Sequence, residues 1–423
     1  MRIEKSRKSR WIIGSLSTLP IVCLTAGLVM AAAGGCARIT KGPVLLGVSG
    51  NGASLMWETK IEGSGEVLYG QGDSLSEKAI TQPLRVEYGI EKKGAAVKKK
   101  TAFLHKVRLE NLEPGRAYSY LVAGPAQKQS RIHKFHTVPA DTNEVTFAVY
   151  GDSRSMPWIH RKIVKQIIKK EVDFVVHTGD LVSSGDSYEQ WGPEYFGPIK
   201  GLAETVPIYI AKGNHEGNSG NFEKLLIGEG GTNSFGFDYG PVHYFCADNV
   251  SRGLNVKEQL KLIAEDARGS NAQWKFVSYH KPSINFGGHW SAWGYPDALR
   301  TLAEAGVDFV LTGHSHQYER FRPVAPPAGT DGSYVTYITC GGGGAPLYDV
   351  KPSLYHSQAK VVHHFCLFHI KGNKLTMYTF DINGQVIDHL EITKTDGRLN
   401  KQYLWTSVPM EEIRRYQELK RKR

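Results

Sequence analysis

The sequence predicts an α/β domain of layered sheets flanked by helices, preceded by a smaller all-β sandwich domain. Two patterns support this division. Residues 42–138 contain short alternating apolar runs separated by Gly-rich turns, which is typical of β-sandwiches. From residue 144 onward, apolar runs alternate with helix-like segments and end in polar residues, which is typical of α/β sheets.

The composition is that of a folded protein with sizeable cores. Of the 423 residues, 41% are hydrophobic and 10% are aromatic, which excludes a wholly disordered chain. Five cysteines are too few for a disulfide framework. The net charge of +11 is accounted for by residues 1–35, 89–100 and 410–423. The remaining chain is balanced, so we expect no long basic stripe across the folded body and no nucleic-acid partner.

Residues 1–36 have the pattern of an export signal. Five basic residues among the first ten precede a segment, residues 11–37, without a charged side chain. Small residues before Cys36 resemble a bacterial lipoprotein cleavage site, although Ala33 stands where such sites usually have Leu. We expect an exported protein of the bacterial cell envelope, attached to the membrane through a lipid on Cys36 or, alternatively, an uncleaved N-terminal anchor.

The other cysteines of the mature chain are expected to be buried free thiols, although one internal disulfide is possible. They are Cys246, Cys340 and Cys366.

The first domain, residues 42–138, is predicted from alternating runs at 44–48, 53–57 and 66–69. The string at 109–120 resembles the corner and strand of fibronectin type III domains. We expect the lysine-rich stretch 92–100 to be a solvated hairpin tip, with binding to an anionic surface as the alternative.

The second domain, residues 144–393, is predicted from five apolar runs, at 145–150, 172–176, 206–211, 274–279 and 307–311. A helix is expected to begin near Ser155 and Pro157. Four glycines at 341–344 lack the Lys-Ser/Thr of a phosphate-binding loop, so we expect a tight turn that brings backbone near the site. Residues 394–423 form a basic tail.

Polar residues just after these five runs form a candidate metal site. In α/β sheets the carboxyl ends of the strands are where ligand sites lie. Carboxylates can bridge two cations, and three imidazoles favour Zn, Fe, Mn or Co over Ca. Mixed oxygen and nitrogen ligands around paired ions are typical of metal-assisted phosphoryl hydrolysis. The candidate ligands are Asp152, Asp180, Asn214, His280, His314 and His316.

These blocks resemble, in order, the motifs of the calcineurin-like metallophosphoesterases. The blocks are Gly151-Asp152, Gly179-Asp180, Gly213-Asn214-His215-Glu216, Val277-Ser278-Tyr279-His280 and Gly313-His314-Ser315-His316. The strings at 313–320 and 234–245 look like the purple acid phosphatase branch, as does a fibronectin-like domain before the catalytic one. The resemblance implies the metallophosphoesterase fold and two metal ions drawn from Fe, Zn and Mn. It also implies hydrolysis of small phosphate monoesters by a metal-activated hydroxide.

The resemblance further implies a role for each residue. Asp180 would bridge the two metals. Asp152 and His316 would bind one metal, and Asn214, His280 and His314 would bind the other. His215 resembles a histidine that contacts the phosphate or the leaving group. His289 lies where such phosphatases often have a substrate-facing histidine, and His177 could brace Asp180 or make a structural hydrogen bond.

Two positions depart from the family pattern. Ser183 stands where purple acid phosphatases have a tyrosine ligand that gives the colour, and Arg154 stands where the wider superfamily has a histidine ligand. We therefore expect a protein that is not purple and a first metal that binds more weakly or takes an extra water. Arg154 would either bind a substrate phosphate or pair with a carboxylate without taking part.

Two other functions stay open. Phosphodiester or nucleotide hydrolysis would use the same scaffold, because the metals do not distinguish monoesters from diesters. A surface lipoprotein with a weakened site would bind without turnover, and the missing first-metal ligand supports that alternative.

Overall fold

The computed structural model describes residues 39–90, 97–125, 129–228, 231–324, 334–395 and 398–399. The export signal with Cys36, residues 92–96 of the lysine-rich stretch and most of the basic tail lie outside the described residues. Within the described ranges, no helix has both the length and the apolar character needed to span a membrane.

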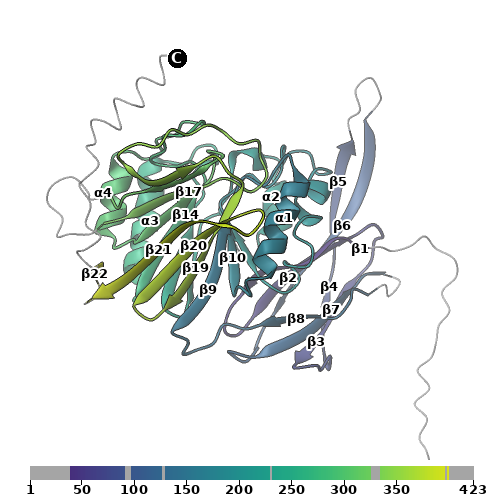
Figure 1. Ribbon diagram of the computed structural model, residues 1–423. Coiled ribbons are helices and arrows are strands. Elements are labelled where there is room, and N and C mark those ends of the chain that lie inside the picture. Colours follow the sequence, from purple (N-terminus) through teal and green to yellow (C-terminus); the bar gives the residue numbers. More distant parts are fainter. Residues whose placement is uncertain are drawn as a thin grey trace, which may run out of the picture. The chain divides into compact units, whose positions relative to one another are not determined.

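The N-terminal part is the expected all-β sandwich, built from two four-stranded antiparallel sheets (Figure 1). The first sheet has the order β1-β2-β6-β5, with β1 Ile39–Val48, β2 Ala53–Thr59, β6 Lys98–Leu109 and β5 Leu84–Ile90. The second has the order β4-β3-β7-β8, with β4 Glu77–Thr81, β3 Gly65–Gln71, β7 Ala117–Ala123 and β8 His133–His136. Alternate side chains of both sheets, among them Leu55, Trp57 and Phe135, are buried between them.

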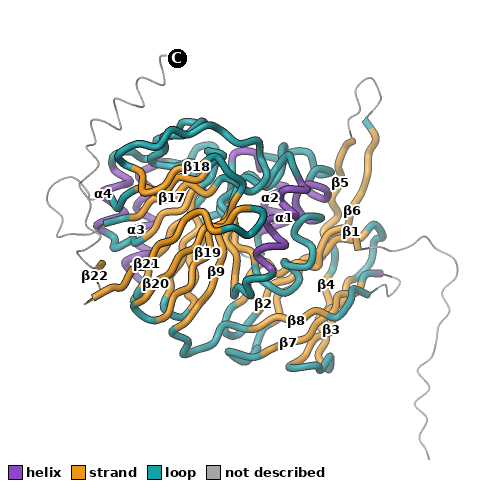
Figure 2. The backbone as a smooth tube through the Cα atoms, in the orientation of Figure 1, coloured by secondary structure: helices purple, strands orange, loops and turns teal. Residues whose placement is uncertain are grey.

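The second part contains two seven-stranded sheets, so strands greatly outnumber helices (Figure 2). One sheet runs β11 (Ile208–Ile210), β10 (Phe174–His177), β9 (Glu144–Tyr150), β19 (His364–Lys371), β20 (Lys374–Asp381), β21 (Val386–Thr395) and β22 (Arg398–Leu399). The other runs β12 (Phe235–Tyr239), β13 (Val242–Cys246), β14 (Trp274–Tyr279), β15 (Phe309–Thr312), β17 (Thr336–Cys340), β16 (Tyr318–Phe321) and β18 (His356–Lys360).

Aromatic side chains fill the space between the two large sheets. The ring of Phe147 on β9 lies 5.2 Å from that of Phe276 on β14 and 5.0 Å from that of Phe368 on β19. All three are fully buried. This core fixes the sheets face to face, so the strand ends of both can contribute to one site.

Short helices cover the outer faces. On the β9 side lie α1 (Pro157–Ile168), the π-helix η2 (Gly192–Phe196) and α2 (Asn221–Leu226). On the β14 side lie α3 (Val256–Gly269) and α4 (Asp297–Glu304). The 3-10 helix η3 (Asn214–Glu216) follows β11. The prediction that α1 begins near Ser155 and Pro157 is confirmed at Pro157. The residue before the helix is Met156, and no side chain caps the N-terminus of the helix.

Buried polar contacts join the sandwich to the segment after β10. The Tyr188 hydroxyl donates to Glu58 at 2.5 Å, and Lys41 pairs with the same carboxylate at 2.5 Å. The Tyr209 hydroxyl donates to the carbonyl of Val48 at 3.0 Å. The N-terminal domain therefore supports the chain between Asp180 and β11, which carries part of the candidate site.

Candidate metal centre

The candidate ligands follow strands that are parallel neighbours. Strands β9, β10 and β11 pair in parallel, and so do β14 and β15. Asp152, Asp180 and Asn214 come after the first three strands, and His280 and His314 come after the other two. Because the carboxyl ends of parallel strands meet at one edge, both sheets deliver polar side chains to the same place.

Tight backbone turns aim several of these residues. Asp152, Asp180 and His314 have positive φ angles of 56°, 58° and 68°, which L-residues rarely adopt. Gly313 precedes His314, and a Cβ on it would stand 2.5 Å from a carboxylate oxygen of Asp152. Such strained turns concentrate at functional sites.

His280 lies at the centre of one group of ligand atoms. Its Nε2 atom is 3.2 Å from Asp180 Oδ1, 3.1 Å from Asn214 Oδ1 and 3.3 Å from His314 Nδ1. All but Asn214 are buried. Four ligand-type atoms thus converge on a small volume.

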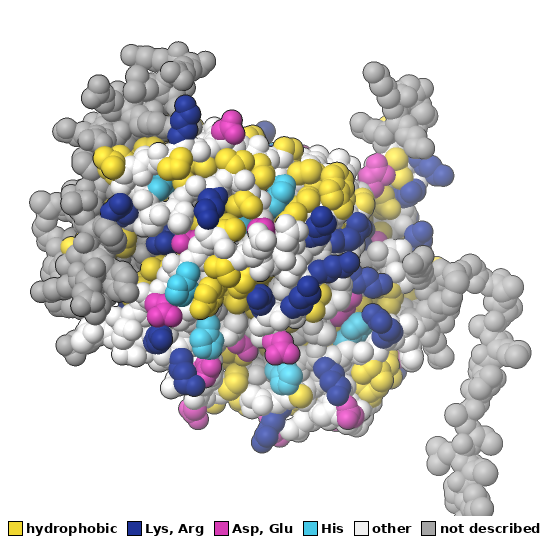
Figure 3. All heavy atoms as spheres, viewed as in Figure 1, with side chains coloured by type: hydrophobic (Ala, Val, Ile, Leu, Met, Phe, Trp, Pro, Cys, Tyr) yellow, Lys and Arg dark blue, Asp and Glu magenta, His cyan; other side chains and the backbone are white. Residues whose placement is uncertain are grey.

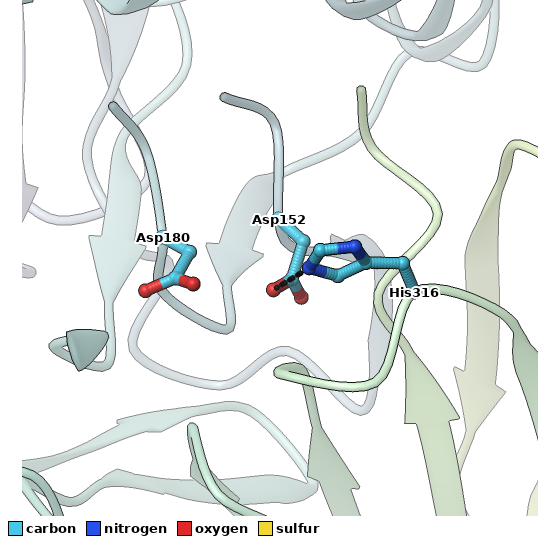
Figure 4. A group of neighbouring side chains, drawn as sticks. All are labelled: Asp152, Asp180 and His316. Carbon is cyan, nitrogen blue, oxygen red and sulfur yellow. Dashed lines mark ion pairs between the residues drawn. The ribbon is translucent and has the colours of Figure 1, made fainter. Parts of the chain in front are cut away.

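A second group lies beside the first. His316 Nε2 is 3.4 Å from Asp152 Oδ1, and ligand atoms of Asp152, Asp180 and His316 lie within 4.8 Å of one another. Figure 4 shows the His316 ring turned toward Asp152, with the Asp180 carboxylate next to them. The structure brings all six predicted ligands together, although their binding of metal stays a prediction.

The imidazoles are oriented as metal ligands usually are. The other ring nitrogen of His280 lies 2.8 Å from the carbonyl of Thr178, and that of His316 lies 2.8 Å from the carbonyl of Pro346. A backbone carbonyl that accepts from one ring nitrogen fixes the tautomer and leaves the other free for a metal. With two buried carboxylates and an amide, this donor set fits hard or borderline cations.

The electrostatics also favour a cation here. Burial alone would raise the pKa of Asp180, but His280 and then His215 outweigh it, so that the pKa lies well below its ordinary value. Burial lowers the pKa of His280, but Asp180 and Asp152 raise it to about 9. A proton on His280 thus balances the anionic carboxylates, and a metal ion would displace that proton on binding.

The two positions that depart from the family pattern, Ser183 and Arg154, make contacts of their own. The Ser183 hydroxyl donates to Glu194 at 2.8 Å. Arg154 Nε lies 3.7 Å from Asp180 Oδ2 and, among the described residues, finds no hydrogen-bond acceptor. Arg154 Nη1 donates to Ser155 at 3.2 Å. Arg154 therefore brings a positive charge to the edge of the candidate site.

The histidines expected to act on substrate lie at the same edge. His215 Nε2 is 3.8 Å from Asp180 Oδ2, and its Nδ1 lies 2.8 Å from the carbonyl of Ser183. His289 is exposed as a residue, but one face of its ring stacks on His314 at 4.1 Å. Partial burial of the ring and then the nearby charge of His316 lower its pKa. His177 instead contacts Ser153 at 3.0 Å and accepts from the Gly179 amide at 3.1 Å, which is a structural role.

The glycines at 341–344 bring backbone against the site as expected. A Cβ on Gly341 would stand 2.8 Å from Asp152 Oδ2. The amides of Gly343 and Ala345 donate to the carbonyls of Gly151 and Asp152 at 2.8 and 2.7 Å. The turn therefore fixes the backbone on both sides of Asp152.

Three residues that shape the site have no role that the sequence predicts. Glu216 is buried and accepts from the amides of Gly213, Asp180 and Leu181 at 2.6, 2.9 and 2.8 Å. Burial and then the charge of Asp180 raise the pKa of Glu216 to about 7. Glu194 holds Ser183, and the ring of Tyr348 stacks on His316 at 4.3 Å. Glu216 belongs to the motif at residues 213–216, whereas Glu194 and Tyr348 lie in no motif that the sequence reveals.

The three expected thiols are free and buried, as predicted. Burial is the largest cause that raises the pKa of each thiol, and the only one for Cys246, so they stay protonated and unreactive.

Comparison with known protein families gives two matches. Residues 145–318 match the model described as calcineurin-like phosphoesterase, and residues 44–137 match the model described as the purple acid phosphatase N-terminal domain. Both matches lie inside the domains that the sequence analysis delimits.

The relatives include purple acid phosphatase 21 of Arabidopsis thaliana, 27% identical over 62% of this chain and 66% of that protein. Probable inactive purple acid phosphatase 1 of the same plant is 26% identical over 58% of this chain and 49% of that protein. A purple acid phosphatase from yellow lupin (Lupinus luteus) seeds has the same fold, with a TM-score of 0.70 and 19% identity, over 86% of this chain and 76% of that one. The chain thus spans about half to two thirds of the length of these two curated relatives.

Proposed function

The chain belongs to the calcineurin-like metallophosphoesterases and has the N-terminal domain of purple acid phosphatases, and from this premise we propose that it hydrolyses phosphate monoesters at a dinuclear metal centre. One observation carries the proposal. His280 Nε2 lies within 3.3 Å of ligand atoms from Asp180, Asn214 and His314, directly beside the Asp152–His316 pair. Two adjacent ligand groups that share a carboxylate are what a metal pair requires.

In this proposal each group of side chains has a separate task. Asp152 and His316 would hold one ion, Asn214, His280 and His314 would hold the other, and Asp180 would serve both. The bound pair supplies Lewis acidity and a hydroxide nucleophile near neutral pH. Buried backbone contacts at Asp152, His280 and His316 keep these ligands in place without rearrangement.

Other side chains would act on the substrate directly. The guanidinium of Arg154 would bind phosphate oxygens, because its Nε donates no hydrogen bond among the described residues. His215 or His289 would protonate the leaving oxygen. The Nδ1 of His215 is held by the carbonyl of Ser183, so its Nε2 faces the site and can pass on a proton when the ring is charged.

A chelation and add-back assay tests the proposal. Removal of metal should abolish hydrolysis of p-nitrophenyl phosphate, and Fe, Zn or Mn should restore it. Asp180→Asn should lower kcat at least about a thousandfold, while Asp297→Asn on the surface of α4 should not. Activity that survives chelation would contradict the proposal, and a parallel diester panel separates the phosphodiesterase or nucleotidase alternative.

A weakened site that binds phosphate without turnover is the second candidate. The Ser183 hydroxyl is engaged by Glu194, and no tyrosine stands at that position. For the same reason we expect the iron-loaded protein to lack a tyrosinate absorption band. One ion per chain, with phosphate binding but no hydrolysis, would favour this candidate over the enzyme.

We further propose that the protein is exported and lipid-anchored at the bacterial cell envelope. The pattern of residues 1–36 supports this, with an uncleaved anchor as the alternative. Cells fed a labelled fatty acid should label the wild type, and Cys36→Ala should remove the label. A label that survives the substitution would contradict the lipid site.

A further inference from the structure

The outer face of α1 is strongly basic. One side of the helix carries exposed residues that follow Trp158 at steps of three and four positions: Arg161 and Lys162, then Lys165, then Ile168 and Lys169. The opposite side, with Ile159, Ile163, Val164 and Ile167, is buried. The helix contains no Asp or Glu. Figure 3 shows Lys and Arg side chains gathered over α1 and beside it.

The basic face continues past η2 to the start of the first strand. Arg161 reaches Gly197, just beyond η2. Gly197 lines a hollow of about 320 Å³ together with Lys200, Lys60 and the first residues of β1. We call this surface, made by the exposed residues of α1 with Lys200 and Lys60, the α1 face.

The basic side chains of the α1 face form no close ion pairs. Among the residues that the structure describes, no carboxylate lies within ion-pair distance of Arg161, Lys162, Lys165, Lys169, Lys200 or Lys60. The buried Glu204 lines the same hollow and interacts electrostatically with Lys200, so it offsets part of the charge at that end only. Exposed lysines elsewhere do form such pairs, for example Lys78 with Glu66 and Lys134 with Asp73, each at 2.6 Å. Glu189 is an exposed acid close to Lys60, in an adjoining hollow. A cluster of unpaired like charges creates a potential that attracts anions.

The chemistry of the α1 face fits a lipid surface. Lys and Arg attract anionic headgroups, and tryptophan favours the interface between headgroups and acyl chains. Trp158 is 57% exposed, and Ile168 is 43% exposed on the same side of α1. A site for one small anion would need convergent donors, whereas these side chains are spread along the whole helix.

The position of the first strand supports the same occupant. Ile39 and Lys41, at the start of β1, line the hollow of the α1 face. Cys36 is only three residues before Ile39, so the reach of the chain limits a lipid attachment there to roughly 11 Å from Ile39. An anchor at that point would keep the α1 face within reach of the bilayer.

We propose that the α1 face docks on the anionic headgroups of a bilayer. The helix begins three residues after Arg154, so docking would hold the candidate metal centre beside the membrane surface. This inference goes beyond the proposed hydrolysis and does not depend on it. The net charge of the sequence did not reveal the α1 face. Acidic residues elsewhere in the chain cancel its positive charges in the sum, although they do not lie beside them in the fold.

Lysine footprinting of the full chain tests the proposal. The protein is acetylated in the presence of nanodiscs, and mass spectrometry follows the labelling of Lys162, Lys165 and Lys169. One set of discs is pure phosphatidylcholine, and the other contains about one third phosphatidylglycerol. Anionic discs should slow the labelling about fivefold or more, and about 0.5 M salt should reverse this. Lys257 on α3, which covers the opposite sheet, should label equally throughout.

Two outcomes overturn the proposal. Equal labelling on both kinds of disc would mean that charge plays no part. Equal protection by a soluble polyanion such as inositol hexakisphosphate, at the same phosphate concentration, would assign the α1 face to a soluble ligand.

A double variant provides the matched test. Lys165→Gln with Lys169→Gln should weaken binding to anionic discs about 25-fold and remove the protection of Lys162. Lys257→Gln with Lys261→Gln on α3 should change neither. Hydrolysis of a soluble ester should stay unchanged in both variants, so failure of docking and failure of the proposed function are separate results.

Discussion

At the scale of single residues, Arg154 brings a positive charge beside the candidate metal ligands. If it binds the substrate phosphate, Arg154→Ala should raise KM about tenfold to a hundredfold, the cost of a lost charged hydrogen bond. Arg154→Lys should recover part of this, because it restores charge without the forked geometry. Steady-state kinetics measure both, with the exposed Arg300→Ala as control. An unchanged KM in Arg154→Ala would show that Arg154 does not bind the substrate and only pairs with Asp180.

Glu194 is a positioning residue in the same region. Its Oε2 atom accepts from the Ser183 amide and hydroxyl, each at 2.8 Å, and from the Ser155 amide at 3.2 Å. Glu194→Gln should lower kcat about tenfold and weaken metal binding, because the loops after β9 and β10 lose a shared charged acceptor. Metal titration and kinetics measure this, with the exposed Glu189→Gln as control. Wild-type values in both assays would rule out the positioning role.

His243 on β13, which is not one of the candidate ligands, predicts a pH-dependent stability. Burial lowers its pKa, but hydrogen bonds to Asp266 and Asp238, at 2.5 and 2.8 Å, outweigh it and raise the pKa. Lys275 is its register partner on β14. A raised folded-state pKa contributes stability that is present below the ordinary histidine value and is lost as pH rises through the raised value.

His243→Gln should therefore cost about 1.5–3 kcal/mol near pH 6 and clearly less near pH 9. Urea unfolding at the two pH values measures the difference. His389→Gln, at an exposed position on β21, is the control. An equal loss at both pH values would show that the charged form of His243 adds nothing.

At the scale of elements, strand ends were predictable and loop contacts were not. Asp152, Asp180 and His280 could be located because each follows an apolar run that becomes a parallel strand. The π-helix η2 carries no periodic apolar pattern, so the contact between Glu194 and Ser183 could not be foreseen. The start of α1 followed from Pro157, whereas Ser155 has a φ of 72° and does not cap the helix.

The segment between β10 and β11 depends on the N-terminal sandwich. Tyr188→Phe removes a hydroxyl that donates to the buried Glu58, and it should cost about 1–2 kcal/mol of unfolding free energy. Denaturant unfolding measures this. Tyr88→Phe, whose ring lies 4.7 Å from that of Tyr188, serves as control and should stay within about 0.5 kcal/mol. No loss in Tyr188→Phe would mean that the contact does not stabilise the segment.

At the scale of the whole molecule, two sheets and a supporting sandwich hold one site. The sandwich and the layered sheets were predictable, because period-two runs and alternating apolar segments report directly on sheets. The α1 face was not, because the charge count over the folded body is balanced and hides the local cluster at residues 161–169. Likewise, the arrangement of Asp180 between two ligand groups depends on both sheets meeting at one edge.

Elemental analysis of the purified full chain after metal loading tests the central claim most directly. We predict about two ions per chain for the wild type and a clear loss in Asp180→Asn, because that carboxylate lies between both ligand groups. Asp297→Asn should keep the wild-type content. A wild-type chain that binds no metal at saturating concentration would contradict the account.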